Sequence, residues 1–264
     1  AVVVPQWTGT LDYGPAFFLE LADLGSGQVD TTALVGGVSA TFTRATAATT
    51  VNSAGTIISV ASGVPRSYYD PTTLDYLGYL AEGARTNLCL QSEDLATTWT
   101  NVQSTESTNA AVAPDGATTA DKMIPDNLST VGQIVQTGLT LTANSTYTAS
   151  IFAKTAEFDS IRILMANAGS TSFATVIYNT TTGSVESAAA VGGNWTSPSS
   201  TAKQHPNGWW RFTLTVTATT DAGDRMILRS PETGDGTSGV YLWGAQLEAA
   251  AFASTYIPTT TLAV

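Results

Sequence analysis

The chain has 264 residues, of which 43% are hydrophobic and 12% charged, and its formal net charge is −11. The charged fraction is about half of the roughly 25% that is usual in soluble domains, and abundant Thr, Ser, Ala and Gly favour β-strands over long charged surface helices. The negative charge, with a pI near 4.3, argues against nucleic acid or an anionic membrane surface as a partner, because both would repel the protein.

The cysteine content and the N-terminal sequence further limit the possible bonds, metal sites and cellular location of the protein. The single cysteine, Cys89, excludes an internal disulfide and a thiolate metal cluster, and its neighbours Leu88 and Leu90 predict a buried, unreactive thiol. No stretch approaches the roughly 20 apolar residues of a membrane span. The start, Ala1–Pro5, lacks the basic segment of a signal peptide. We therefore expect a protein made in the cytoplasm, with no cofactor and no metal.

The first part of the chain has the weakest pattern. Residues 17–24 fit a helix and a strand equally well. From there on, the sequence predicts strands over residues 40–46 and 56–60, joined by a hairpin turn at 52–55. A turn is also predicted at 70–72, where Pro71 takes the favoured second position of a type I turn.

The segment Gly78–Asp94 joins this loop-rich region to a more regular β pattern. Glu82, Arg85 and Asn87 lie there among leucines, which predicts a structural clasp. We expect Glu82 and Arg85 to pair across a turn that Gly83 permits. Because an unpaired, partly buried charge costs about 3–5 kcal/mol, Arg85→Ala is expected to cripple folding or assembly, and Arg85→Lys to be partly tolerated.

Short apolar or alternating runs recur after residue 99, with Gly, Asn, Asp and Pro between them. The predicted strands lie at 122–124, 133–135, 147–153, 161–165, 173–178, 209–216, 226–228 and 240–243. In the run 209–216, alternation places Trp210 and Phe212 on one face and Trp209 and Arg211 on the other. The pattern predicts an all-β protein: an antiparallel β-sandwich, specifically a jelly roll, over residues 92–264, preceded by a loop-rich β region over residues 1–91. We expect this N-terminal region to serve attachment and oligomerisation.

Two motifs have no catalytic interpretation. Gly234–Gly239 matches G-x-G-x-x-G, but a strand-like run follows where a dinucleotide site needs a helix, so a turn is expected. The only histidine, His205, lies in a turn-like stretch and is predicted to be at the surface. A lone histidine also leaves no basis for a Ser-His-Asp triad or a histidine metal site.

The adjacent acids are Glu93/Asp94, Asp221/Asp224 and Glu232/Asp235. Glycoside hydrolysis needs two carboxylates about 5–9 Å apart, and loop carboxylates can also bind Ca²⁺. None of these pairs lies in a recognisable signature, so solvated turn positions are expected.

Aromatic residues give the stronger functional indication. Trp195, Trp209 and Tyr241 lie in the second half of the chain. A flat aromatic ring on a sandwich can stack on a sugar, so these three are the candidate carbohydrate-binding residues. The alternative is that a loop or a neighbouring subunit covers Trp209.

Several blocks of sequence, in their order, resemble a family of tailed-bacteriophage and prophage virion structural proteins. The blocks are residues 42–46, 63–66, 69–71, 82–88, 91–94, 113–116, 208–211, 239–248 and 256–258. The resemblance implies a jelly roll similar to carbohydrate-binding modules, carried by a capsid decoration, head-fibre or tail-fibre-like protein. It implies no catalysis, and it assigns no ligand residues.

The leading expectation is a non-enzymatic virion protein that contacts major capsid or tail proteins. Apolar chain ends favour a homo-oligomer, of which a trimer is one form. The alternatives are an adhesin for host surface polysaccharide and a polysaccharide depolymerase.

Overall fold

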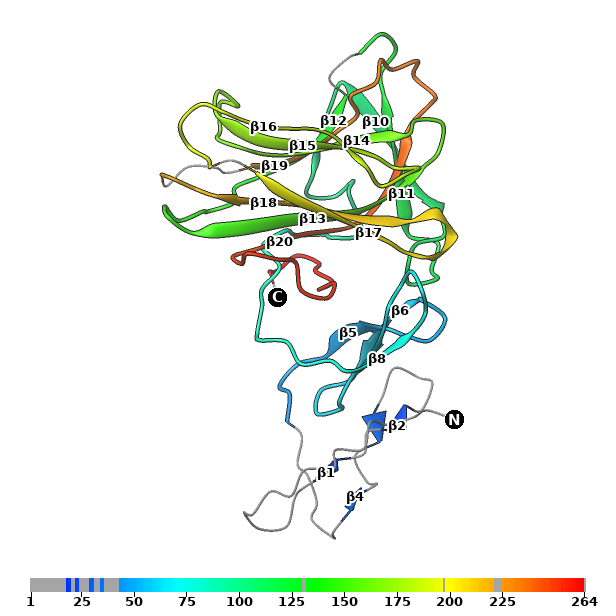
Figure 1. Ribbon diagram of the computed structural model, residues 1–264. Helices are drawn as coiled ribbons and strands as arrows, with labels where there is room; N and C mark the ends of the chain where they lie inside the picture. The colour runs from blue at the N-terminus through cyan, green and yellow to red at the C-terminus, as the bar shows by residue number, and fades with distance from the viewer. Residues whose placement is uncertain are drawn as a thin grey trace.

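A computed structural model describes residues 43–129, 132–196, 198–220 and 225–263, together with the backbone of four short strands before them. The described chain is almost entirely β, and two six-stranded antiparallel sheets lie face to face as a β-sandwich (Figure 1). No helix among the described residues is long and apolar enough to cross a membrane.

We call the sheet that faces the N-terminal region sheet I. Its strand order is β10-β11-β20-β13-β18-β17. The strands are β10 (Ser104–Ala111), β11 (Ala120–Pro125), β13 (Thr146–Thr155), β17 (Ser199–Gln204), β18 (Trp210–Thr217) and β20 (Val240–Glu248).

The opposite sheet is sheet II, and its order is β16-β15-β14-β19-β12-β9. The strands are β9 (Thr100–Val102), β12 (Gln133–Thr137), β14 (Ser160–Ala166), β15 (Phe173–Asn179), β16 (Val185–Val191) and β19 (Arg225–Arg229).

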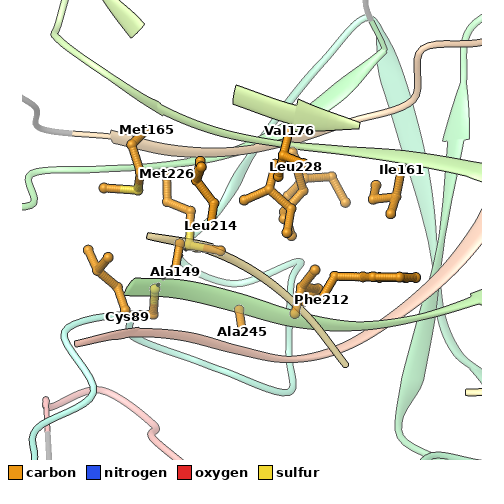
Figure 2. Close-up of a cluster of buried hydrophobic side chains, with 14 of the residues drawn as sticks. Cys89, Ala149, Ile161, Met165, Val176, Phe212, Leu214, Met226, Leu228 and Ala245 are labelled. Carbon is orange, nitrogen blue, oxygen red and sulfur yellow. Dashed lines mark hydrogen bonds between the residues drawn. The ribbon is translucent and has the colours of Figure 1, made fainter. Parts of the chain in front are cut away.

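The main core lies between the two sheets. Because side chains alternate along a strand, β18 turns Phe212, Leu214 and Val216 into this core, as the sequence predicts. Figure 2 shows how side chains of the two sheets meet there, with Phe212 and Leu214 from sheet I opposite Val176 and Leu228 from sheet II.

Two hairpins lie below sheet I in Figure 1. They pair β5 (Ala48–Val51) with β6 (Ile57–Val60), and β7 (Ser67–Tyr69) with β8 (Tyr76–Tyr79). The predicted turn at 52–55 is confirmed. Its Gly55 has a φ of 77°, and an added Cβ would collide with the Pro206 ring. Four earlier strands pair as β1 (Phe18–Leu19) with β4 (Leu34–Val35), and β2 (Ala22–Asp23) with β3 (Val29–Asp30).

A second core joins the hairpins to the outer face of sheet I. Val51 and Ile57 of the first hairpin belong to the same buried cluster as Phe152, Trp209 and Trp243 of the sandwich. The apolar residues on the outer face of sheet I are therefore covered by the N-terminal hairpins and not by water.

The eight strands predicted after residue 99 are all present. The prediction misses β9, β10, β16 and β17 of the sandwich, and before the sandwich it misses β5, β7 and β8. It places a strand over residues 40–46 instead, but residues 43–46, which precede β5, contain no strand. Residues 40–42 of that predicted strand lie outside the described part. The β-sandwich is confirmed, whereas the jelly-roll connectivity and the boundary at residue 91 stay predictions.

Candidate functional site

A cleft opens where the N-terminal hairpins, the outer face of sheet I and the C-terminal segment 251–256 meet. Its volume is about 380 Å³, which lies in the range of about 300–1,000 Å³ that is usual for small-molecule sites. Hydroxyl side chains from β17 and β18 line it, together with aromatic rings from β7, β13 and the C-terminal segment. The lining includes Tyr68, Phe152, Ser199, Thr201, Lys203, His205, Arg211, Thr213 and Phe252.

Strand alternation builds the floor of the cleft. The side chains of Thr201 and Thr213 are register neighbours on the outer face of sheet I, and their hydroxyls lie 2.8 Å apart. On this same face β18 carries Arg211, because the opposite face of the strand packs into the sandwich core. The sheet thus presents hydroxyls and one guanidinium to the cleft.

Arg211 is the guanidinium at the centre of the floor. It donates from Nη1 to the carbonyl of Ser254 (2.6 Å) and from Nη2 to Oγ of Ser150 (3.1 Å), and it lies over the Phe152 ring at 5.3 Å from its centroid. Its Nε is buried without a hydrogen-bond partner. Burial lowers the pKa of Arg211, and Glu248 is the largest of the electrostatic influences that raise it. The group stays charged at neutral pH.

His205 is buried, so its predicted surface position is wrong. Only 6% of the residue is exposed, and its ring meets the Phe152 ring edge-on at 5.0 Å between centroids. Burial, followed by repulsion from Arg211 and Lys203, lowers the pKa of His205 to about 3. The imidazole is therefore neutral at neutral pH, and its Nδ1 has no hydrogen-bond partner.

Glu82 forms the opposite wall, and its partner is Arg66, not Arg85. Nη2 of Arg66 lies 3.1 Å from Oε2 of Glu82, and both groups are largely buried. Glu82 also accepts hydrogen bonds from the amide and the hydroxyl of Thr255. The predicted Glu82–Arg85 pair is wrong because Arg85 is exposed, with its guanidinium over the ring of Phe252, which is itself exposed.

Asn87 fixes the C-terminal segment against the chain that leaves the hairpins. Its Nδ2 donates to the carbonyls of Ala245 (3.0 Å) and Ile257 (2.9 Å), and its Oδ1 accepts from the amides of Cys89 and Leu247 (3.0 Å each). The side chain is fully buried. Asn87 and Glu82 thus link the N-terminal region to the end of the chain and hold one wall of the cleft. We keep the name clasp for this link, although the sequence predicted a joint to the sandwich fixed by a Glu82–Arg85 pair.

The three aromatic candidates do not form a sugar platform. Trp195 and Trp209 are 5% and 1% exposed, and they belong to different cores, Trp195 between the sheets and Trp209 beneath the hairpins. Nε1 of Trp209 donates to the carbonyl of Val112 (3.1 Å), so the alternative that a loop covers Trp209 is correct. Tyr241 is half-buried against the second core.

Glu232 and Asp235, two of the acids that the sequence indicates, have structural partners. Glu232 accepts hydrogen bonds from the amides of Asp159 and Ser160. Asp235 caps the Gly234–Gly239 turn by accepting from the amides of Thr237 and Ser238, so the predicted turn is confirmed. Asp221 and Asp224 lie outside the described residues. Within the described ranges, no group of three His, Cys, Asp or Glu side chains is placed to hold a metal.

One acid that the sequence did not single out is unusual. Both carboxylate oxygens of Glu106 on β10 are buried without a hydrogen-bond partner. Burial and the neighbouring Asp121 raise the pKa of Glu106 to about 8. Asp121 is itself occupied by the amides of Leu95 and Asn109.

Alternation in the sequence places Arg211 on the outer face of β18, but neither Arg211 nor Tyr68 is among the predicted site residues. Alternation alone identifies the outward face of β18, and a cation at a strand position that faces away from the main core is a usable signal. The sequence contains no local signal that the hairpins and the C-terminal segment cover that face.

No protein-family model matches the sequence, and the comparison with curated proteins finds no match. Two solved structures are distantly similar in shape. One is the CBM22-1–GH10 part of endo-1,4-β-D-xylanase 10B from Clostridium thermocellum, complexed with xylohexaose (10% identity, TM-score 0.37), and the other is the enzymatically active domain of tailspike protein 4 of bacteriophage CBA120 (14% identity, TM-score 0.34). The matches cover 66% and 60% of this chain but 29% and 20% of theirs.

Proposed function

We propose that the chain is a non-enzymatic structural protein of a bacteriophage particle. The proposal rests on the positions that the sequence blocks resembling the phage family take in the structure. Arg66, Glu82, Asn87, Trp209 and Tyr256 all lie in those blocks, and all of them join the N-terminal hairpins and the C-terminal segment to the sandwich. Four of the nine blocks of resemblance therefore contribute to one structural joint, which suits a rigid module on the surface of a particle.

The chemistry of two potential catalytic side chains supports a structural role. Burial raises the pKa of the Cys89 thiol, and its Sγ lies 3.6 Å from the sulfur of Met226 in the core. A buried thiol of raised pKa is a poor nucleophile. His205 is buried and neutral, with its pKa lowered to about 3, so it is a weak base at neutral pH.

Labelling of native particles tests the proposal. Antibodies against the recombinant chain, detected with gold on purified particles by electron microscopy, are expected to mark a fixed position on the capsid or the tail. Purified particles that lack the chain by mass spectrometry would refute a virion role. Release of reducing ends from host capsule by the pure chain would refute the non-enzymatic assignment.

An adhesin for host polysaccharide is the second candidate function. The cleft favours it, because hydroxyl side chains and aromatic rings around one concave site are typical of polar-ligand pockets. The aromatic residues of such an adhesin would be Tyr68 and Phe252, which line the cleft, and not the buried Trp195 and Trp209.

A further inference from the structure

The cleft contains one cation that is not matched by a partner carboxylate. Two of its three charged lining residues belong to ion pairs, Glu82 with Arg66 and Lys203 with Asp70 at 2.8 Å. Arg211 forms no ion pair within the described residues. The acid with the largest electrostatic influence on Arg211 is Glu248, whose carboxylate already accepts hydrogen bonds from Gln246 and Ser254.

Arg211 also has N–H donors beyond those in its two hydrogen bonds. A guanidinium carries five N–H donors, and the two hydrogen bonds of Arg211 to Ser150 and Ser254 use two of them. Buried polar atoms without a partner are rare in native proteins and mark places where a water or a ligand belongs. In this cleft, Nε of Arg211 and Nδ1 of His205 are two such atoms.

The remaining lining is neutral and suits a sugar ring. Hydroxyls of Ser199, Thr201 and Thr213 can exchange hydrogen bonds with sugar hydroxyls, and the aromatic rings of Tyr68 and Phe252 give apolar surface for the C–H groups of a pyranose. A planar guanidinium binds a carboxylate through two parallel N–H donors, which is the strongest polar contact this cleft offers.

We propose that the cleft is a binding site for an acidic saccharide, with Arg211 binding its carboxylate and the hydroxyls of β17 and β18 binding its ring. This extends the second candidate function from polysaccharide in general to sugars that carry a carboxylate. Saccharide binding is measured on the purified full chain without particles. A negative result would therefore contradict the binding site and not the virion role.

The test is an NMR titration of the ¹⁵N-labelled chain that follows the Nε–H signal of the Arg211 side chain. The probes are D-glucuronate and D-glucose, which differ only in a carboxylate in place of a hydroxymethyl group. We expect glucuronate to shift this signal in a saturable way and to bind at least tenfold more tightly than glucose. Equal binding of the two sugars, or no saturable shift with glucuronate, would overturn the proposal.

A pair of surface variants completes the test without replacing Arg211. Thr201→Glu adds a carboxylate to the exposed cleft edge of β17, where it competes for Arg211, and Ser187→Glu adds the same charge to the exposed edge strand β16 of sheet II. Glucuronate binding is expected to fall at least tenfold in the first variant and to stay within twofold in the second. Equal effects in both variants would contradict a site in the cleft.

Discussion

At the scale of single residues, the spacing of charged groups in the sequence does not identify their partners in the structure. Glu82 and Arg85 are three positions apart in the sequence, yet Glu82 pairs with Arg66, which lies 16 positions away, and Arg85 faces solvent. An ion pair brought together by tertiary structure leaves no local signal in the chain.

The first prediction compares these two arginines. Arg66→Ala removes the partner of Glu82 and a hydrogen bond to the carbonyl of Thr49, and it is expected to lower the free energy of unfolding by about 3 kcal/mol. Arg85→Ala removes only an exposed contact with Phe252 and is expected to cost less than about 1 kcal/mol. Urea unfolding of the two variants measures both values, and a reversed order would contradict the assignment of the pair.

The second prediction concerns His205 and pH. Its pKa falls from the usual 6.5 to about 3 on folding, so the unfolded chain takes up a proton that the folded chain excludes. The stability due to this group is complete above pH 6.5 and is lost as the pH falls toward 3, by about 1.4 kcal/mol per pH unit.

The measurement is the difference in unfolding free energy between wild type and His205→Gln from pH 4 to pH 8. Glu106 has a raised pKa, so its own contribution changes in the opposite direction, being full below pH 4.5 and lost as the pH rises through about 8. Both proteins keep Glu106, and the difference isolates His205. We expect the advantage of wild type to shrink below pH 6.5, and a constant difference would contradict a neutral buried imidazole.

At the scale of elements, the four sandwich strands that the sequence does not predict all lie at the edges of the two large sheets. β10 and β17 end sheet I, and β9 and β16 end sheet II. Most of their residues are exposed, as in β16, whose seven residues are nearly all open to solvent. Strands with few buried positions need few large apolar residues, so the alternation that identifies central strands is weak there.

The third prediction applies one substitution to a central strand and to its edge neighbour. Val176 on β15 is fully buried in the main core, whereas Val185 on the adjacent β16 is 48% exposed. Val176→Ala is expected to destabilise the protein by about 2–3 kcal/mol because it leaves a cavity, and Val185→Ala by no more than about 0.5 kcal/mol. Chemical unfolding measures both, and similar losses would mean that β16 is covered in solution.

At the scale of the whole molecule, the N-terminal hairpins and the sandwich share a core and a clasp. Tyr256 packs on Trp243, with ring centroids 4.5 Å apart, and its hydroxyl lies 2.7 Å from that of Ser92. Asn87 connects the chain that leaves the hairpins to Ala245, Leu247 and Ile257 through three long-range hydrogen bonds. The chain that enters the sandwich is therefore fastened to the chain that leaves it.

The fourth prediction tests this clasp. Asn87→Ala leaves four buried backbone groups without their partner and is expected to lower the free energy of unfolding by at least about 3 kcal/mol. Asn127→Ala, at an exposed turn position, is the matched control and is expected to change it by less than about 0.5 kcal/mol. Hydrogen exchange is expected to increase first in segments 87–92 and 245–260, and unchanged exchange there would show that the clasp is not needed.

The sequence by itself determined the all-β class, the central strands and the inward face of β18, because these depend on local alternation between apolar and polar residues. It also predicted that Gly78–Asp94 joins two regions, and the boundary between them stays a prediction. The tertiary structure alone decided which side chains meet. His205 and Trp209 become buried because the hairpins and the C-terminal segment cover the outer face of sheet I. The Arg66–Glu82 pair and the cleft around Arg211 arise from contacts between segments up to 207 residues apart, and no local pattern encodes such contacts.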